Sequence, residues 1–149
     1  MIDIESLVFD TVYNQLNQQF STIYVTAGFD ERKASYPSVI VRETGNVPYQ
    51  RGNTDSCAEN FTTVTYEIEV ISNKCDMGRS ECKKILSAVD DIMTGMKFRR
   101  IYKSNPSNIN RSAFNQFARY EAIVGKGVTT VTGTGNEVVS TTTFQMYRR

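Results

Sequence analysis

The strongest constraint on the fold comes from residues 61–96, where the spacing of the apolar residues changes once. From Phe61 to Ile71, apolar and polar residues alternate, which predicts a strand with one buried face. From Gly78 to Thr94, apolar residues recur three and four positions apart, which predicts an amphipathic helix. A sheet with one apolar face and a helix with one apolar stripe bury both surfaces when the helix lies across the sheet. We therefore expect this strand and this helix to form the centre of the core.

The other segments predict a second helix and a set of shorter strands. Residues 4–20 have helical spacing, and Asp3 is placed to cap this helix. Strands are predicted at residues 21–26, 38–43, 96–103 and 115–124. We also expect a long polar loop from Thr44 to Asn60, a left-handed helix end at Gly95 and a turn at residues 104–108.

A β-hairpin is predicted near the C-terminus. The run Gly133-Thr134-Gly135-Asn136 is a turn signal, and Val and Thr residues dominate both of its flanks. These flanks are too polar to bury both faces, so the hairpin is expected to reach beyond the body as an arm. Together the elements predict an α+β fold in a single domain, residues 1–149. Its mainly antiparallel sheet has two amphipathic helices packed on one face, plus the long C-terminal β-hairpin arm.

The residue types offer little for catalysis. Histidine is absent, which removes the commonest general base, the commonest metal ligand and every Ser-His or Cys-His pair. The three cysteines, Cys57, Cys75 and Cys82, match no metal-binding spacing and are expected to be reduced. Glu67 and Glu69 share one strand face, but no third acidic group at motif spacing supports a cation site, so a solvated or salt-bridged face is preferred. We expect no enzymatic activity, no cofactor and no metal.

The charge balance gives no attraction to a polyanion. There are 17 Lys and Arg residues against 16 Asp and Glu residues, so no specific nucleic acid is expected as a partner. No apolar run is long enough for a membrane span, and the N-terminus lacks the pattern of a secretion signal. The basic clusters are Arg99-Arg100 with Lys103, and Arg148-Arg149. They are expected to meet solvent or a partner protein, with nucleic-acid phosphate as the alternative.

The order of the segments resembles one known family. The resemblance rests on an N-terminal amphipathic helix, "YPSVIVRE", a long polar loop, "FTTVTYEIEVIS", "ECKKILSAVDDIM", "RYEAIVGKGV" and a β-rich end. Over about residues 1–128 the chain is similar to the tail terminator, or tail completion, proteins of long-tailed bacteriophages and prophage tail particles. This resemblance implies a homo-oligomer, a hexameric ring that caps the tail tube, stops its polymerisation and joins the tail to the head. Its partners would be the tail tube protein and a head-closure or neck protein, in a virion made in the bacterial cytoplasm.

Candidate interface residues are chosen because they lie on segments expected to protrude. They are Arg51, Asp55 and Glu59 in the long loop, and Thr134, Gly135, Asn136 and Glu137 at the tip of the arm. A Val- and Thr-rich arm has strand edges that need partners, and a second copy of the chain supplies them. Three alternatives remain open: another neck or head-closure protein, another binding module, or a small nucleic-acid-binding α/β module.

Overall fold

The computed structural model describes residues 1–28, 35–50, 60–110, 113–134 and 137–147, with side chains omitted for 109–110, 127–134 and 137–145. The elements in chain order are α1 (Glu5–Gln19), β1 (Tyr24–Thr26), β2 (Ser38–Pro48), β3 (Phe61–Ser72), α2 (Gly78–Gly95), β4 (Arg99–Lys103), β5 (Ser107–Asn110), β6 (Ala113–Thr134) and β7 (Glu137–Tyr147). Most of the predicted elements are therefore present near their expected positions.

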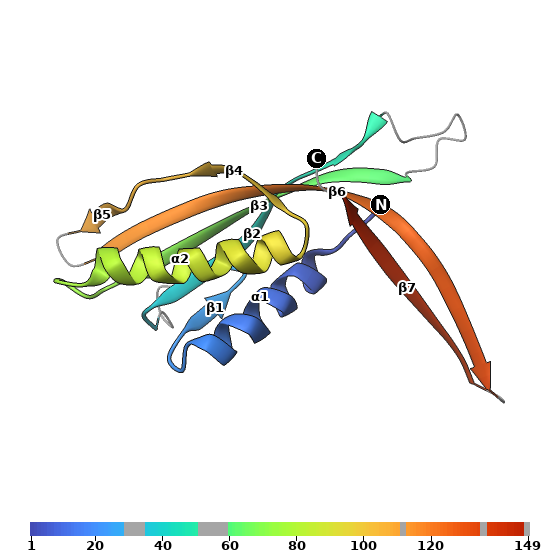
Figure 1. Ribbon diagram of the computed structural model, residues 1–149, viewed down its shortest axis with the longest axis horizontal. Coiled ribbons are helices and arrows are strands. Elements are labelled where there is room, and N and C mark those ends of the chain that lie inside the picture. The colour runs from blue at the N-terminus through green and yellow to red at the C-terminus, as the bar shows by residue number, and fades with distance from the viewer. Residues whose placement is uncertain (29–34, 51–59, 111–112, 135–136, 148–149) are drawn as a thin grey trace.

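The described strands form one mixed sheet with the order β1-β2-β3-β6-β4, and β5 and β7 also pair with β6. The β1–β2 pair is parallel, and the other pairs are antiparallel. Both helices lie on the same side of the sheet, and the long β6 curves across the whole molecule (Figure 1). The predicted α+β class, with two helices packed on a mostly antiparallel sheet, is confirmed.

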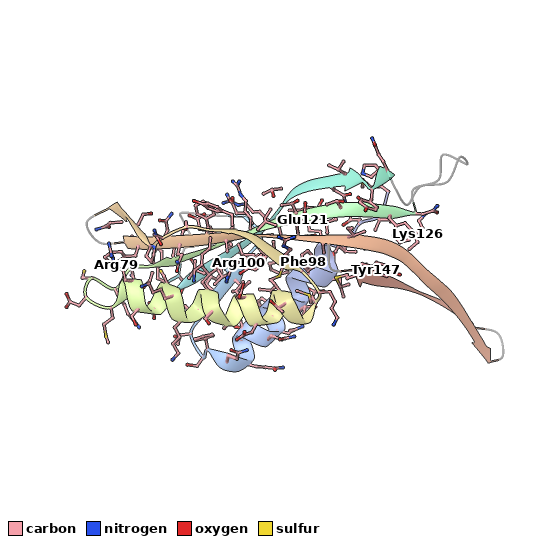
Figure 2. All side chains as sticks on the ribbon, turned by 45° about the horizontal axis from the view of Figure 1, so that its top comes forward. Arg79, Phe98, Arg100, Glu121, Lys126 and Tyr147 are labelled. Atoms are coloured by element: carbon pink, nitrogen blue, oxygen red, sulfur yellow. The ribbon has the colours of Figure 1, made fainter. Side chains whose placement is uncertain are left out.

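The core lies between the sheet and the helices, as the alternation in β3 and the stripe on α2 predict. Alternate residues of β3 are buried, and the buried stripe of α2 faces them. The largest side chains in this layer are two tyrosines and a phenylalanine, Tyr66, Tyr120 and Phe98. The rings of Tyr66 and Phe98 meet edge to face at 5.6 Å, and Phe98 lies beside the end of α2 (Figure 2). Such aromatic contacts add to the free energy gained from apolar burial.

The predicted loop from Thr44 to Asn60 is wrong in its first part, because β2 continues to Pro48. Its polar residues stay in the strand because β3 supplies hydrogen-bond partners: the Thr62 hydroxyl donates to the Asn46 side chain at 2.6 Å. The strand register shifts between Glu43 and Gly45, where Thr44 is an extra residue in β2, and Gly45 stays paired with Thr65. Turn-forming residues thus lie in an extended strand where a neighbouring strand pairs with them.

The end of α2 also differs from the prediction. Gly95 lies inside the helix, and the left-handed residue is Lys97, with φ of 69°. The Phe98 N–H donates to the Met93 carbonyl, and the Lys97 N–H donates to the Thr94 carbonyl, which is the Schellman pattern. Burial of Phe98 after this turn stabilises it without a glycine. The predicted turn at residues 104–108 is likewise shortened by β5.

Close packing at Gly78 makes a testable prediction. A Cβ at Gly78 would lie 2.5 Å from Cδ2 of Phe114, whereas a Cβ at Gly95 would have no neighbour within 4 Å. We expect Gly78→Ala to lower the free energy of unfolding by about 1–3 kcal/mol, the usual range for overpacking. Gly95→Ala is the matched control and should leave it unchanged or raise it by up to about 1 kcal/mol. Urea denaturation measures both, and equal stabilities of the two variants would contradict this packing.

Candidate protein interface

The longest strand of the protein, β6, extends beyond the body of the sheet. From Phe114 to Gly125 it pairs with β3 on one edge. Beyond that point it pairs with β7 as far as Thr134, which lies opposite Glu137. We call residues 127–134 and 137–144 the arm. It projects from the end of the sheet as a curved ribbon (Figure 1), so the predicted C-terminal hairpin is present.

The arm begins at an irregularity in strand pairing. Lys126 lies opposite Phe144, and Thr129 lies opposite Thr142, so β6 has one more residue than β7 between these pairs. A bulge of this kind bends a strand and increases its twist. Figure 2 labels Lys126 and Tyr147 where the arm leaves the body. The bulge therefore lies where the arm leaves the body of the sheet (Figure 2).

Both edges of the arm are open in the part of the chain that the structure describes. β3 begins at Phe61, opposite Gly125, so no described strand continues along that edge of β6 beyond this pair. The outer edge of β7 is also without a neighbouring strand. Open edges present unpaired N–H and C=O groups, and a two-stranded ribbon is marginally stable in water by itself. The arm is therefore a surface that a further strand would stabilise.

An apolar hollow of ≈ 390 Å³ lies at the root of the arm, lined by Tyr49, Phe61, Ile123 and Tyr147. The rings of Phe61 and Tyr147 meet edge to face with centroids 5.9 Å apart. A Cβ at Gly125 would lie 2.8 Å from Phe61, so the glycine lets this ring lie against β6. Tyr147 is 45% exposed. The hollow lies on the sheet face opposite the helices, since Phe61 lies on the same face of β3 as Glu67.

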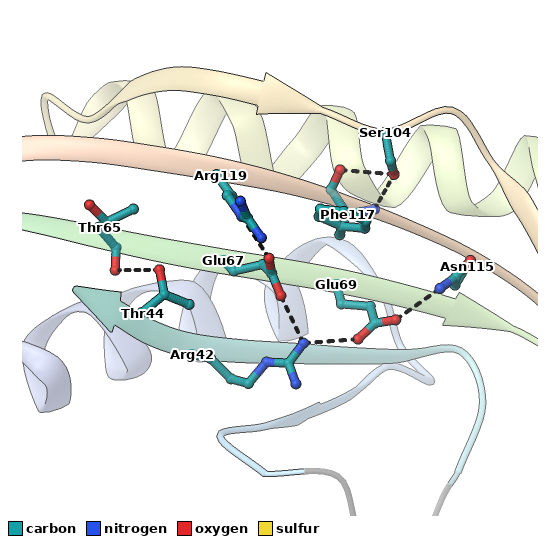
Figure 3. Close-up of polar contacts among 9 residues, drawn as sticks. All are labelled: Arg42, Thr44, Thr65, Glu67, Glu69, Ser104, Asn115, Phe117 and Arg119. Atoms are coloured by element: carbon teal, nitrogen blue, oxygen red, sulfur yellow. Dashed lines mark hydrogen bonds and ion pairs between the residues drawn. The ribbon is translucent and has the colours of Figure 1, made fainter.

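The rest of this helix-free face carries a network of paired charges (Figure 3). Glu67 accepts hydrogen bonds from Arg42 at 2.9 Å and from Arg119 at 2.8 Å. Glu69 accepts from Arg42 at 3.2 Å and from Asn115 at 3.0 Å. This is the salt-bridged face that the sequence favours. Each carboxylate is engaged by an arginine, so the face is polar and locally neutral.

β4 forms the edge of the sheet that lies farthest from β1. All five of its residues are exposed, including Ile101 at 48% and Tyr102 at 51%. The Tyr102 ring lies 5.6 Å from that of Phe117, and Arg100 pairs with Asp90 at 2.9 Å. In the described residues no strand pairs with the outer edge of β4. The basic cluster of Arg99, Arg100 and Lys103 thus lies on an open edge that also exposes two large apolar side chains.

The candidate interface residues are only partly described. Thr134 ends β6 and Glu137 begins β7, so both lie at the far end of the arm and pair across it. Arg51, Asp55, Glu59, Gly135 and Asn136 lie outside the described residues. Sequence reasoning missed the hollow and the open edge of β4. The available signal for the hollow was the two tyrosines, Tyr49 and Tyr147, which lie in mainly polar segments.

Burial shifts the pKa values of three ionisable side chains. Cys82 is fully buried, and burial raises the pKa of its thiol to about 11, while Cys75 is exposed. Burial likewise raises the pKa values of Tyr66 and Tyr120, and the Tyr66 hydroxyl donates to Glu43 at 2.9 Å. Over the described residues, no cluster of three or more Asp, Glu, Cys or His side chains is arranged to hold a metal ion.

No protein-family model matches the chain, and no curated protein matches it significantly. Within the described ranges, neither α1 nor α2 is both long and apolar enough to cross a membrane. The interpretation of the candidate interface therefore rests on the sequence and on the geometry given above.

Burial of Cys82 predicts a loss of stability in alkali. Its thiol pKa rises from 9.0 to about 11 on folding, so its stabilising contribution is complete below pH 9 and is lost as the pH rises towards 11. We expect urea denaturation to show a steeper fall between pH 9 and 11 for the wild type than for Cys82→Ala. Both proteins contain the same tyrosines, so tyrosine ionisation contributes equally to the two pH profiles and does not affect their difference. Parallel pH profiles would contradict this assignment.

Proposed function

We propose that this chain is a non-enzymatic structural protein that forms a ring on the tail tube of a long-tailed phage and terminates its growth. The family resemblance suggests the role of tail terminator, and the arm is the structural observation that supports this proposal most. A ribbon with two open edges is poorly suited to a monomer, because its unpaired backbone groups invite pairing with other chains. In a closed ring every copy receives the same partner, so every arm is stabilised equally.

The surfaces near the arm suit a protein partner better than a nucleic acid. The hollow at the arm root is apolar, and the adjoining face has Glu67 and Glu69 paired with Arg42 and Arg119. A nucleic-acid surface needs a net excess of positive charge to neutralise phosphates. This face has no such excess. Apolar hollows next to satisfied polar groups are typical of protein interfaces.

The mechanism that follows is steric. The ring binds the last ring of tube subunits and covers the edges that would accept another ring. Its opposite side presents a different surface, which a head-closure or neck protein binds. No covalent chemistry is required, in agreement with a sequence that lacks histidine.

Light scattering on the purified protein tests this proposal. We expect the mass of a hexameric ring, either alone or after mixing with the tail tube protein of the same phage. Tubes polymerised with the protein present should be capped and uniform in length, because a bound ring blocks further addition. Tubes that grow equally long with and without the protein would contradict the terminator role. A protein that stays monomeric and does not bind the tube protein would also contradict it.

Removing the arm should separate assembly from folding. Residues 127–143 are replaced by Asn-Gly, which joins the paired residues Lys126 and Phe144 through a two-residue hairpin turn. The core residues are untouched, so we expect the free energy of unfolding to change by less than about 1 kcal/mol. Ring formation and tube capping should be lost. Normal rings from the shortened protein would show that the arm is not the interface.

A further inference from the structure

We infer that the partner of the arm is β4 of a second copy, which adds as a strand to the open β6 edge at residues 127–134. This inference rests on the proposed ring and specifies its contact. In this contact the accepting edge is residues 127–134 of β6, and the donating edge is β4. Strand addition of this kind gains its affinity from main-chain hydrogen bonds, and side chains determine its specificity.

Strand order prevents a chain from making this contact with itself. β4 and β7 lie end to end on one edge of β6: Arg99 is opposite Glu121, and Tyr147 is opposite Ile123. The open edge of the arm is the other edge of β6, the one that β3 occupies up to Phe61. The accepting and donating edges therefore lie on opposite sides of the same strand. A contact between them is head-to-tail, and repetition of such a contact closes into a ring when the rotation permits.

The side chains on the two edges are compatible. β4 brings the exposed apolar residues Ile101 and Tyr102. The segment 127–134 contains no charged residue, so it does not repel Arg99, Arg100 and Lys103. Tyr102 lies opposite Arg119 and against Phe117, on the helix-free face of the sheet. Burial of Ile101 and Tyr102 in the contact supplies the apolar area that strand pairing alone lacks.

Length and exposure also favour β4 over β1, the strand at the far edge of the sheet. β1 has three residues, Tyr24–Thr26, whereas β4 has five, Arg99–Lys103. A longer strand makes more ladder hydrogen bonds with the arm. β4 also exposes two large apolar side chains, Ile101 and Tyr102, whereas the residues of β1 are buried or half-buried. β4 is therefore the better match for the arm.

Crosslinking between two differently tagged variants tests the contact. One variant carries Ile101→Cys and the other carries Thr130→Cys. Both also carry Cys57→Ser and Cys75→Ser. The two variants are mixed, with and without tail tube protein, and a short bismaleimide is then added. We expect a crosslinked pair carrying both tags. The control replaces Ile101→Cys by Leu7→Cys, since Leu7 on α1 is 44% exposed, close to the 48% of Ile101. The control mixture should give no such pair.

A second pair of variants measures the energy of the same contact. Ile101→Lys should weaken self-association by about tenfold or more, as for a residue central to an interface. Leu7→Lys should leave it unchanged, and the melting temperatures of both should match the wild type because both side chains are exposed. Normal rings from Ile101→Lys would overturn the β4 contact. So would rings of the cysteine variants that give no more crosslink than the Leu7→Cys control. Either result leaves the proposal of a ring standing.

The failure of the contact and the failure of the proposed function are distinguishable. A specific crosslink between positions 101 and 130 in a protein that does not cap tubes supports the contact and removes the terminator role. A protein that stays monomeric and uncrosslinked under both conditions overturns the contact. Capped tubes without the crosslink retain the terminator role and assign the ring contact to another surface.

Discussion

Backbone pairing along β6 is the interaction on which the rest of the structure depends. This strand is hydrogen-bonded to β3, β4, β5 and β7, so it joins the central strand, one sheet edge and the arm in a single ladder. Its inner half is buried against the helices through Ala118, Tyr120, Ala122 and Val124. Beyond Gly125 the same strand continues past the start of β3 and pairs with β7. A single element therefore belongs both to the buried core and to the arm, whose edges are open in the described part of the chain.

Much of the core was predictable because it depends on local periodicity. The strand Phe61–Ser72 and the helix Gly78–Gly95 follow directly from alternation and from three-to-four spacing. The extension of β2 to Pro48 was not predictable from local preference, since Gly45 and Asn46 favour turns and are held extended by pairing with β3. Lys97 is a similar case, because burial of Phe98 compensates for a left-handed residue with a Cβ.

The candidate interface was predictable only where it depends on residues that are close together in the sequence. The arm has a turn signal and two Val- and Thr-rich flanks, all within one segment. The hollow is different, because Tyr49, Phe61, Ile123 and Tyr147 come from four separate parts of the chain and meet only through the order of the strands. The open edge of β4 likewise depends on which strand lies next to β6. Long-range topology, which local patterns do not encode, determines both features.

The distribution of burial limits where the described part of the chain can bind a partner through its sheet. One face is covered by α1 and α2. The other face, apart from the hollow at the arm root, carries carboxylates already paired with Arg42 and Arg119. A partner bound over these half-exposed arginines would gain little, because the carboxylates already have hydrogen-bond donors. At the strand edges, by contrast, backbone groups gain hydrogen bonds on pairing. Association through edges, with the apolar hollow beside them, is therefore favoured over association through either face.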